Sequence, residues 1–312
     1  MCSRIFWNTP ATAKVIGRTL DWEVSDEPVL WHFPRGLERS GMVDDAVTWT
    51  SSFRSLATTF WGLGTSEGIN EAGLSAHLLY LASSDFGARD GRPGCGFHLW
   101  AQYALDNFAT VAEALAGLEQ IQIAQVAVRG RTIGVHLALE DPSGDSAIVE
   151  ILDGRTVIHH GPSTRVMTND PPYDEQLRNL ERFTVFGGTE PLPGDIISDQ
   201  RFVRATYYLQ HLPEPSDELE AVAGVMGIAR NVSVPFGAPY DDFTVYPTWW
   251  ASVTDVTNRA YYFQSTLAPN VIWAEIDAPA LADSEQVLSI DPTDVGLVGD
   301  ISSRFVPADS PF

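Results

Sequence analysis

Cysteine is scarce in this chain of 312 residues, and the common metal-binding spacings are missing. The only 2 cysteines, Cys2 and Cys95, are too few for the disulfide framework of a small extracellular protein. No Cys-x-x-Cys or His-Glu-x-x-His pattern occurs, and the adjacent pair His159 and His160 is more simply explained as a strand end. We therefore expect neither a bound metal nor another cofactor.

Long hydrophobic runs are also absent. No apolar stretch approaches the roughly 18 residues that cross a bilayer, so we expect no membrane partner. The opening residues, MCSRIFW, do not combine a basic region with an apolar core, as a secretory signal does. The sequence as given indicates the cytoplasm, whereas a leader removed from before Cys2 would indicate the periplasm.

Positive charge is in short supply as well. Lys and Arg number 19 against 41 Asp and Glu, which gives a formal net charge of −22. Such a surface repels phosphate backbones and anionic lipids, so nucleic acid is excluded as an expected partner.

The chain does contain alternating strand-like and helix-like segments, recognised by apolar spacing and turn residues. Expected strands are residues 3–7, 15–20, 55–62, 73–81, 134–140, 146–152, 156–160, 261–266 and 271–276, with a glycine-rich connection at 62–73. Expected helices are residues 97–118, 173–183, 199–211 and 216–230. Because no repeat, linker or charge block divides the chain, we predict one α+β domain over residues 1–312, with antiparallel sheets covered by helices.

The most informative residue is Cys2, directly after the initiator methionine. Removal of Met1, which is usual before a small side chain, would leave Cys2 with both a thiol and a free α-amine. An α-amine titrates near pH 8, so it can accept the thiol proton without a histidine. Taken alone, a cysteine at this position is more simply an incidental residue of the first strand.

Residues 17–22, GRTLDW, supply two further candidates. In an uninterrupted strand Arg18 and Asp21 would face opposite sides, because their offset is odd. A strand that ends near Thr19 and turns at Asp21 would let both side chains reach one terminus. Arg18 would then stabilise the Cys2 thiolate, and Asp21 would accept hydrogen bonds from the ammonium group.

Five motifs occur in order along the chain. They are MCSR at residues 1–4, GRTLDW at 17–22, GINEAGL at 68–74, TNDP at 168–171, and LPGD with RFVRA at 192–195 and 201–205. Together they resemble the choloylglycine hydrolase and penicillin V acylase family of N-terminal nucleophile hydrolases, from residue 2 to about residue 275. The resemblance implies a four-layer αββα sandwich, with two antiparallel sheets between helical layers, and an enzyme that hydrolyses a linear amide bond.

Carried over by position, the resemblance implies that Cys2 is the nucleophile and that Arg18 and Asp21 support its thiol and amine. Asn169 matches the asparagine whose side-chain amide binds the oxyanion, although an asparagine before Asp-Pro-Pro is also a common turn residue. Arg201 matches a second arginine near the nucleophile.

Tyr80 matches the position that is asparagine in bile salt hydrolases and often tyrosine in penicillin V acylases. Its backbone N–H would complete the oxyanion site, whereas an alignment slip would put Leu79 or Leu81 there instead. Trp22 and the short stretch between residues 169 and 201 resemble the group found mostly in Gram-negative bacteria. For Trp22 and Tyr80 this implies a place on the wall of the substrate pocket.

The implied function is that of a penicillin V acylase or N-acyl homoserine lactone acylase, acting on a small-molecule amide as a homo-oligomer, either dimer or tetramer. Two alternatives stay open: a conjugated bile salt hydrolase, and a catalytically silent binding protein of the same fold. The intact candidate set argues against the silent protein. Cys95, Arg204 and the pair Trp249–Trp250 are interpreted as structural.

Overall fold

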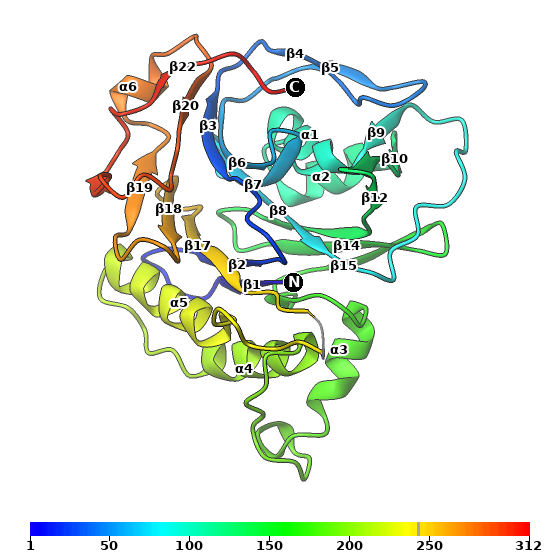
Figure 1. Ribbon diagram of the computed structural model, residues 1–312, viewed down its shortest axis with the longest axis vertical. Helices are drawn as coiled ribbons and strands as arrows, with labels where there is room; N and C mark the ends of the chain where they lie inside the picture. Colours follow the sequence, from blue (N-terminus) through cyan, green and yellow to red (C-terminus); the bar gives the residue numbers. More distant parts are fainter. Residues whose placement is uncertain (242–243) are drawn as a thin grey trace.

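The computed structural model describes residues 1–241 and 244–312, and it consists of two large sheets packed face to face (Figure 1). Sheet A contains, in spatial order, β16 (Val166–Met167), β1 (Cys2–Trp7), β2 (Val15–Asp21), β17 (Thr248–Asp255), β18 (Ala260–Ser265), β19 (Ile272–Glu275) and β21 (Gly299–Asp300). Its strands are antiparallel except for the last pair, β19 and β21.

Sheet B is antiparallel throughout its described strands. Its spatial order is β15 (Arg155–His160), β14 (Ser146–Leu152), β13 (Val135–Glu140), β8 (Ser75–Tyr80), β7 (Gly64–Asn70), β6 (Ser55–Phe60), β3 (Val29–Phe33), β20 (Leu288–Ile290) and β22 (Val306–Pro307). Three small pairs are β4 (Glu38–Ser40) with β5 (Thr48–Thr50), β9 (Gly94–Gly96) with β10 (Gln122–Ala124), and β11 (Ala127–Val128) with β12 (Arg131–Thr132).

Helices cover the outer faces of both sheets. The helices α4 (Ser198–Gln210) and α5 (Glu218–Val232) pack on sheet A, while α1 (Trp100–Asn107) packs on β7 and β8 of sheet B (Figure 1). The remaining helical segments are α2 (Val111–Leu118), α3 (Tyr173–Leu180), α6 (Pro279–Ala282) and the 3-10 turns η1 (Phe97–Leu99) and η2 (Thr184–Phe186). The predicted αββα sandwich is therefore confirmed.

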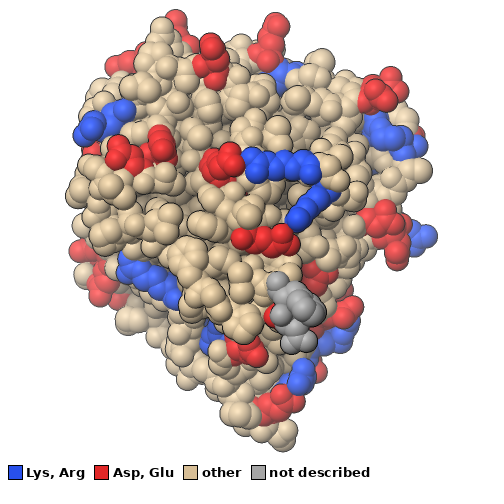
Figure 2. All heavy atoms as spheres, viewed as in Figure 1, with Lys and Arg blue, Asp and Glu red and all other residues tan. Residues whose placement is uncertain are grey.

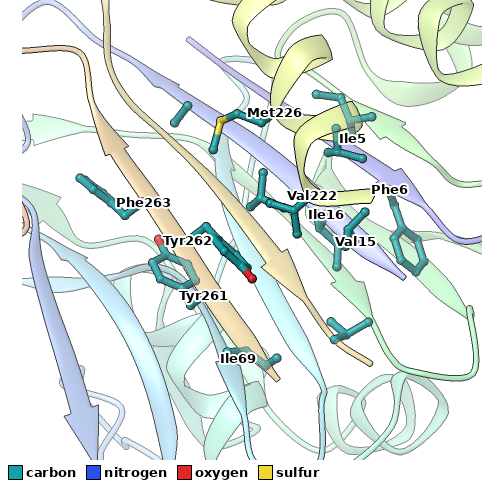
Figure 3. Packing of buried hydrophobic residues seen from close by; sticks show 14 of the residues in the cluster. Ile5, Phe6, Val15, Ile16, Ile69, Val222, Met226, Tyr261, Tyr262 and Phe263 are labelled. Atoms are coloured by element: carbon teal, nitrogen blue, oxygen red, sulfur yellow. The ribbon is translucent and has the colours of Figure 1, made fainter. Parts of the chain in front are cut away.

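The core that holds the nucleophile's strand lies on both faces of sheet A. From α5, Val222 and Met226 point onto this sheet, where Ile16 lies beneath them (Figure 3). A Cβ at Gly17 would lie 2.6 Å from Val225 Cγ1, so glycine allows α5 to approach β2 this closely. Apolar packing thus fixes the position of β2, and β1 pairs with it along its whole length.

The glycine-rich segment 62–73 is not a loop, as the sequence suggested, but contains β7 in the middle of sheet B. Its glycines mark close approach. A Cβ at Gly68 would lie 2.5 Å from the Leu56 carbonyl oxygen and 2.8 Å from Leu105 Cδ1. A glycine within a strand lets a neighbouring backbone or side chain come this close, and here it allows α1 to pack on β7.

The expected helix at 97–118 is broken in two. Phe108 has extended dihedral angles (φ −128°, ψ 148°) and ends α1, while the Thr110 hydroxyl accepts a hydrogen bond from Glu113 N and begins α2. The apolar spacing continued across this break, which explains the error. A second error concerns β2, which continues as a strand to Asp21 instead of ending near Thr19 and turning at Asp21.

No helix among the described residues is long and apolar enough to cross a membrane. On the face shown in Figure 2, acidic side chains are spread over the surface, and several lie beside basic ones. The acidic excess is therefore not gathered into a single patch on this face.

Candidate active site

Cys2 is the first residue of β1 and pairs with Leu20 of β2, so the neighbouring strand fixes its main chain. Its side chain is buried. The preceding Met1 is buried too, and its ammonium group donates to the Asp21 carbonyl oxygen. Burial lowers the pKa of this α-amine, against the opposing influence of Cys2 and Asp21. A charged amine is costly at this place unless a carboxylate lies close to it.

Arg18 projects from β2 toward sheet B. Its Nη2 lies 3.9 Å from Cys2 Sγ and donates to the Leu78 carbonyl oxygen at 2.9 Å. Its Nη1 donates to Glu67 Oε2 at 3.1 Å. Burial alone would lower the pKa of Arg18, but Glu67 and Cys2 outweigh it and raise this pKa. The sulfur therefore lies beside a guanidinium that stays positively charged.

A chain of alternating charges holds Arg18 in place between the sheets. Glu67 also lies 3.1 Å from His77 Nδ1, and His77 Nε2 lies 3.3 Å from Glu140 Oε2. Glu140 in turn pairs with Arg4. Burial would raise the pKa of Glu67, but Arg18 and His77 lower it to about 2. Glu67 is therefore ionised at any pH where the protein would work, and it restrains the guanidinium.

Asp21 faces the other side of sheet A. Its Oδ1 accepts a hydrogen bond from Thr248 Oγ1 at 2.6 Å, and its Oδ2 lies 3.4 Å from Arg201 Nη1. No hydrogen bond reaches Oδ2 from the described residues. Asp21 is three residues after Arg18, so in a strand the two side chains point to opposite faces of the sheet. Arg18 accordingly lies beside the Cys2 thiol, and Asp21 lies beside the main chain of residues 1–2.

Asn169 and Arg201 complete the set from outside the strand. Asn169 Oδ1 accepts from Cys2 N at 2.6 Å and from Arg201 Nη2 at 2.9 Å, while its Nδ2 donates to the Tyr80 carbonyl oxygen at 2.6 Å. Arg201, on α4, donates through Nη1 to the Cys2 carbonyl oxygen at 2.7 Å and to Ser3 Oγ at 2.5 Å. Arg201 therefore positions both the nucleophile's main chain and the Asn169 amide.

The backbone N–H of Tyr80 points toward this cluster. Leu81 N donates to the Gly134 carbonyl oxygen at 2.9 Å, so the Leu81 N–H is turned toward β13 and is not free. Since N–H directions alternate along a strand, the Tyr80 N–H points away from β13, and the Leu79 N–H toward it. Of the three positions that the sequence left open, Tyr80 is the one whose backbone faces Asn169.

An apolar pocket opens beside Cys2. Besides Cys2, Arg18 and Asp21, its lining consists largely of aliphatic and aromatic side chains: Leu20, Trp22, Asp26, Phe60, Trp61, Ser66, Leu78, Leu79, Tyr80, Phe97, Ile133 and Val135. The rings of Trp22 and Tyr80 touch edge to face, with centroids 5.4 Å apart. They form one continuous wall of the pocket.

Several of these residues were not identified from the sequence. Glu67 lies in the segment interpreted as a loop, and Thr248 lies in β17, a strand that was not expected at all. Trp61 follows β6 with φ 50°, and its indole N–H donates to the Ser25 carbonyl oxygen at 2.9 Å. A positive φ in a bulky residue is costly, and such strain is concentrated at functional sites. No pattern in the sequence signalled it.

The residues interpreted as structural lie away from the sulfur or in the core. Arg204 donates to the Asp195 carbonyl oxygen, and Cys95 is fully buried in β9, where burial raises its pKa well above the usual range. Trp249 donates through its indole N–H to the Trp22 carbonyl oxygen at 2.9 Å, so it supports the pocket wall from behind. Within residues 1–241 and 244–312, no cluster of three or more His, Cys, Asp or Glu is placed to hold a metal ion.

Comparison with known proteins identifies the class. Residues 2–290 match the family of linear amide C–N hydrolases, choloylglycine hydrolase family. The chain belongs to this family and is an enzyme of the amide-hydrolase class.

Named relatives give a finer comparison. The chain is 35% identical to the penicillin V acylase of Pectobacterium atrosepticum, over 98% of this chain and 90% of that protein. Its fold is similar to the structure of penicillin V acylase from Agrobacterium tumefaciens, with a TM-score of 0.89, 38% identity, and 99% and 98% of the two chains covered. The bile salt hydrolase/transferase of Bifidobacterium longum subsp. longum is a more distant relative, 21% identical over 93% of this chain and 99% of that protein.

Proposed function

We propose that this enzyme is an acylase that uses Cys2 as an N-terminal nucleophile and cleaves amides such as penicillin V and long-chain N-acyl homoserine lactones. The observation that carries the proposal is that Arg18, Asp21, Asn169 and Arg201 all converge on atoms of residues 1–2 beside an apolar pocket. The similarity to two penicillin V acylases supports the choice of substrate class.

Removal of Met1 gives the α-nitrogen of Cys2 a lone pair. This amine takes the proton of the Cys2 thiol, and Arg18 stabilises the thiolate that forms. Asp21 Oδ2, which accepts no hydrogen bond from the described residues, then accepts one from the resulting ammonium group. The thiolate attacks the amide carbonyl, the ammonium returns its proton to the leaving amine, and water hydrolyses the thioester.

The negative charge on the carbonyl oxygen is stabilised by two donors. One is Asn169 Nδ2, and the other is the Tyr80 backbone N–H. The Asn169 amide cannot rotate freely, because its Oδ1 is bound by Arg201. A fixed donor costs no reorganisation as charge develops, so it lowers the barrier.

The pocket wall favours flat rings and alkyl chains over a steroid. Trp22 and Tyr80 pack against each other, and Phe60 and Trp61 line the pocket as well. A phenoxyacetyl ring packs well on aromatic edges, and an alkyl chain gains roughly 0.8 kcal/mol per buried methylene. A rigid four-ring steroid is bulkier than either group, and we expect the large side chains of this wall to obstruct its entry. A bile salt hydrolase is therefore the second candidate, supported by the more distant relatives.

Trp22→Ala is expected to weaken kcat/KM for penicillin V and long-chain acyl homoserine lactones by about 1–3 kcal/mol, the usual scale for a lost apolar pocket contact. Hydrolysis rates for penicillin V, acyl homoserine lactones of several lengths, and glycine- or taurine-conjugated bile salts measure both this loss and the substrate preference. Trp273→Ala, which removes a half-buried indole from β19, serves as the control and should leave the preference unchanged. Bile salt turnover tenfold above that of penicillin V would favour the second candidate.

Arg201→Ala is expected to shift the pH–rate profile, because Arg201 lies between the Asp21 carboxylate and the main chain of Cys2. Arg204→Ala is the matched control, one turn further along α4, with its contacts directed to Asp195 and Asn231. Its profile should follow that of the unmodified enzyme. Equal shifts in both variants would show that α4 has moved as a whole and would contradict the role given to Arg201.

The single domain, the compartment and the assembly stay predictions. The assembly that the resemblance implies is a homo-oligomer of two or four chains. Sedimentation of the purified enzyme measures its mass in solution, and a monomer at micromolar concentration would contradict the prediction.

A further inference from the structure

Asp26 is a buried carboxyl on the wall of the apolar pocket. It lies between the end of β2 and the start of β3, only 3% exposed, and its backbone oxygen accepts from Trp61 N at 2.7 Å. Its two side-chain oxygens both accept from the single indole N–H of Trp250, at 3.0 and 3.1 Å. A buried carboxylate is costly unless a cation or several donors compensate its charge.

The charges around Asp26 do not include a direct cationic partner among the described residues. Arg18, held beside the Trp250 ring at 4.9 Å, favours the carboxylate from β2, and Glu67 opposes it from β7. Cys2 and Asp21 line the same pocket. Burial outweighs the hydrogen bond from Trp250 and the attraction of Arg18, and it raises the pKa of Asp26 to about 7. Near neutral pH a large share of the carboxyl groups carry a proton.

The protonated carboxyl has a hydrogen to donate, and none of its hydrogen bonds with the described residues uses that hydrogen. Every contact that the described residues make with the two oxygens comes from an N–H donor, either the Trp250 indole or the backbone N–H of Asp26 itself. A buried donor without an acceptor costs free energy, and the pocket that Asp26 lines is a direction from which an acceptor can come. A bound acyl group would supply it.

We propose that Asp26 is a specificity-determining residue, which donates a hydrogen bond to an oxygen within the acyl group of the substrate. This inference rests on the proposed acylase function and deepens it. The preferred acyl groups carry an ether or keto oxygen close to the amide, as in phenoxyacetyl and 3-oxoacyl amides, whereas plain hydrocarbon chains lack the acceptor.

The test compares two amides of 6-aminopenicillanic acid that differ in one atom. One carries the phenoxyacetyl group, and the other carries 3-phenylpropanoyl, in which a methylene replaces the ether oxygen. The measured quantity is the ratio of their kcat/KM values from pH 5.5 to 9. Titration of the nucleophile and its base affects both substrates alike and cancels in this ratio.

The unmodified enzyme should prefer the ether by about tenfold at pH 5.5 to 6, the usual scale for one hydrogen bond to a buried group. Because the raised pKa keeps the donor protonated below about pH 7, the preference should fall toward unity as the pH rises through that value. Asp26→Asn keeps a donor at every pH, so its ratio should stay high and flat. Asp26→Leu has no donor, so its ratio should be near one throughout.

Asp255→Asn is the matched control. Asp255 is also buried with a raised pKa, but it lies at the opposite end of β17 from Thr248 and should leave the ratio and its pH dependence unchanged. A ratio that does not change with pH in the unmodified enzyme would overturn this inference and leave the proposed function standing. A ratio in Asp26→Leu as high as in the unmodified enzyme would do the same. If Asp26→Leu does not fold, the inference is still tested by the pH dependence of the ratio in the unmodified enzyme and by the ratio in Asp26→Asn. Failure to cleave either amide would overturn the proposed function and this inference with it.

Discussion

A chain that keeps one residue before Cys2 is expected to be folded and inactive. The nitrogen of Cys2 is then part of a peptide bond, which has no basic lone pair, and it already donates to Asn169 Oδ1 at 2.6 Å. Met1 also lines the hollow at the pocket mouth, beside Trp22 and Tyr80. The extension therefore removes the base and occupies space beside the pocket. Loss of general-base catalysis alone costs on the order of 10² to 10⁴ in rate.

Mass spectrometry of active enzyme should show a chain that begins at Cys2, and the extended variant should keep its melting temperature. Cys2→Ala, also folded, should have no turnover. A thiol alkylator should inactivate the processed enzyme with one label, since burial and a raised pKa protect Cys95. Full activity in the extended variant would show that the α-amine is not the base.

Asn169→Ala is expected to lower kcat by a factor on the order of 10² to 10³, the usual cost of one oxyanion donor. The loss should fall on kcat more than on KM, because the interaction strengthens as the carbonyl oxygen becomes negative. The variant also removes the acceptor that orients Cys2 N and Arg201 Nη2. A second variant is needed to separate the two effects.

Asn169→Asp separates them. It keeps an oxygen for Cys2 N and Arg201, but it replaces the Nδ2 donor by a second acceptor facing the Tyr80 carbonyl oxygen. If the donor matters most, the aspartate variant should be at least as slow as the alanine variant. If orientation matters most, it should recover activity. A change confined to KM in Asn169→Ala would rule out the oxyanion role.

Local patterns predicted those elements whose burial has a simple period. The outer helix α5 was found within about two residues, and β1, β13 and β14 nearly to the residue. The predictions of secondary structure failed where tertiary packing, and not the local sequence, determines which residue type is used. The glycines of β7 indicated a loop when only the local sequence was considered, although Gly68 lies at the contact between β7 and α1. No local pattern singled out β17, which lies between β2 and β18.

The candidate site follows the same rule. Cys2 and the four residues around it were accessible from the sequence because ordered motifs carry them, and the structure brings all five together. Glu67 and Asp26 were not, because a carboxylate in a sequence gives no sign of whether it will be buried. Burial and the neighbours that follow from it are what make Glu67 a restraint on Arg18 and Asp26 a proton carrier near neutral pH.

The uninterrupted course of β2 has a consequence for redesign. Because Arg18 and Asp21 lie on opposite faces of sheet A, the nucleophile and the base of one residue are served by separate neighbourhoods. Substitutions between the two sheets, at Glu67 or His77, would change what holds Arg18 beside the sulfur and leave the contacts of Asp21 in place. Substitutions under α4 would change the contacts of Asp21 and leave those of Arg18 in place. The two tasks of one residue can therefore be approached from opposite sides of the same sheet.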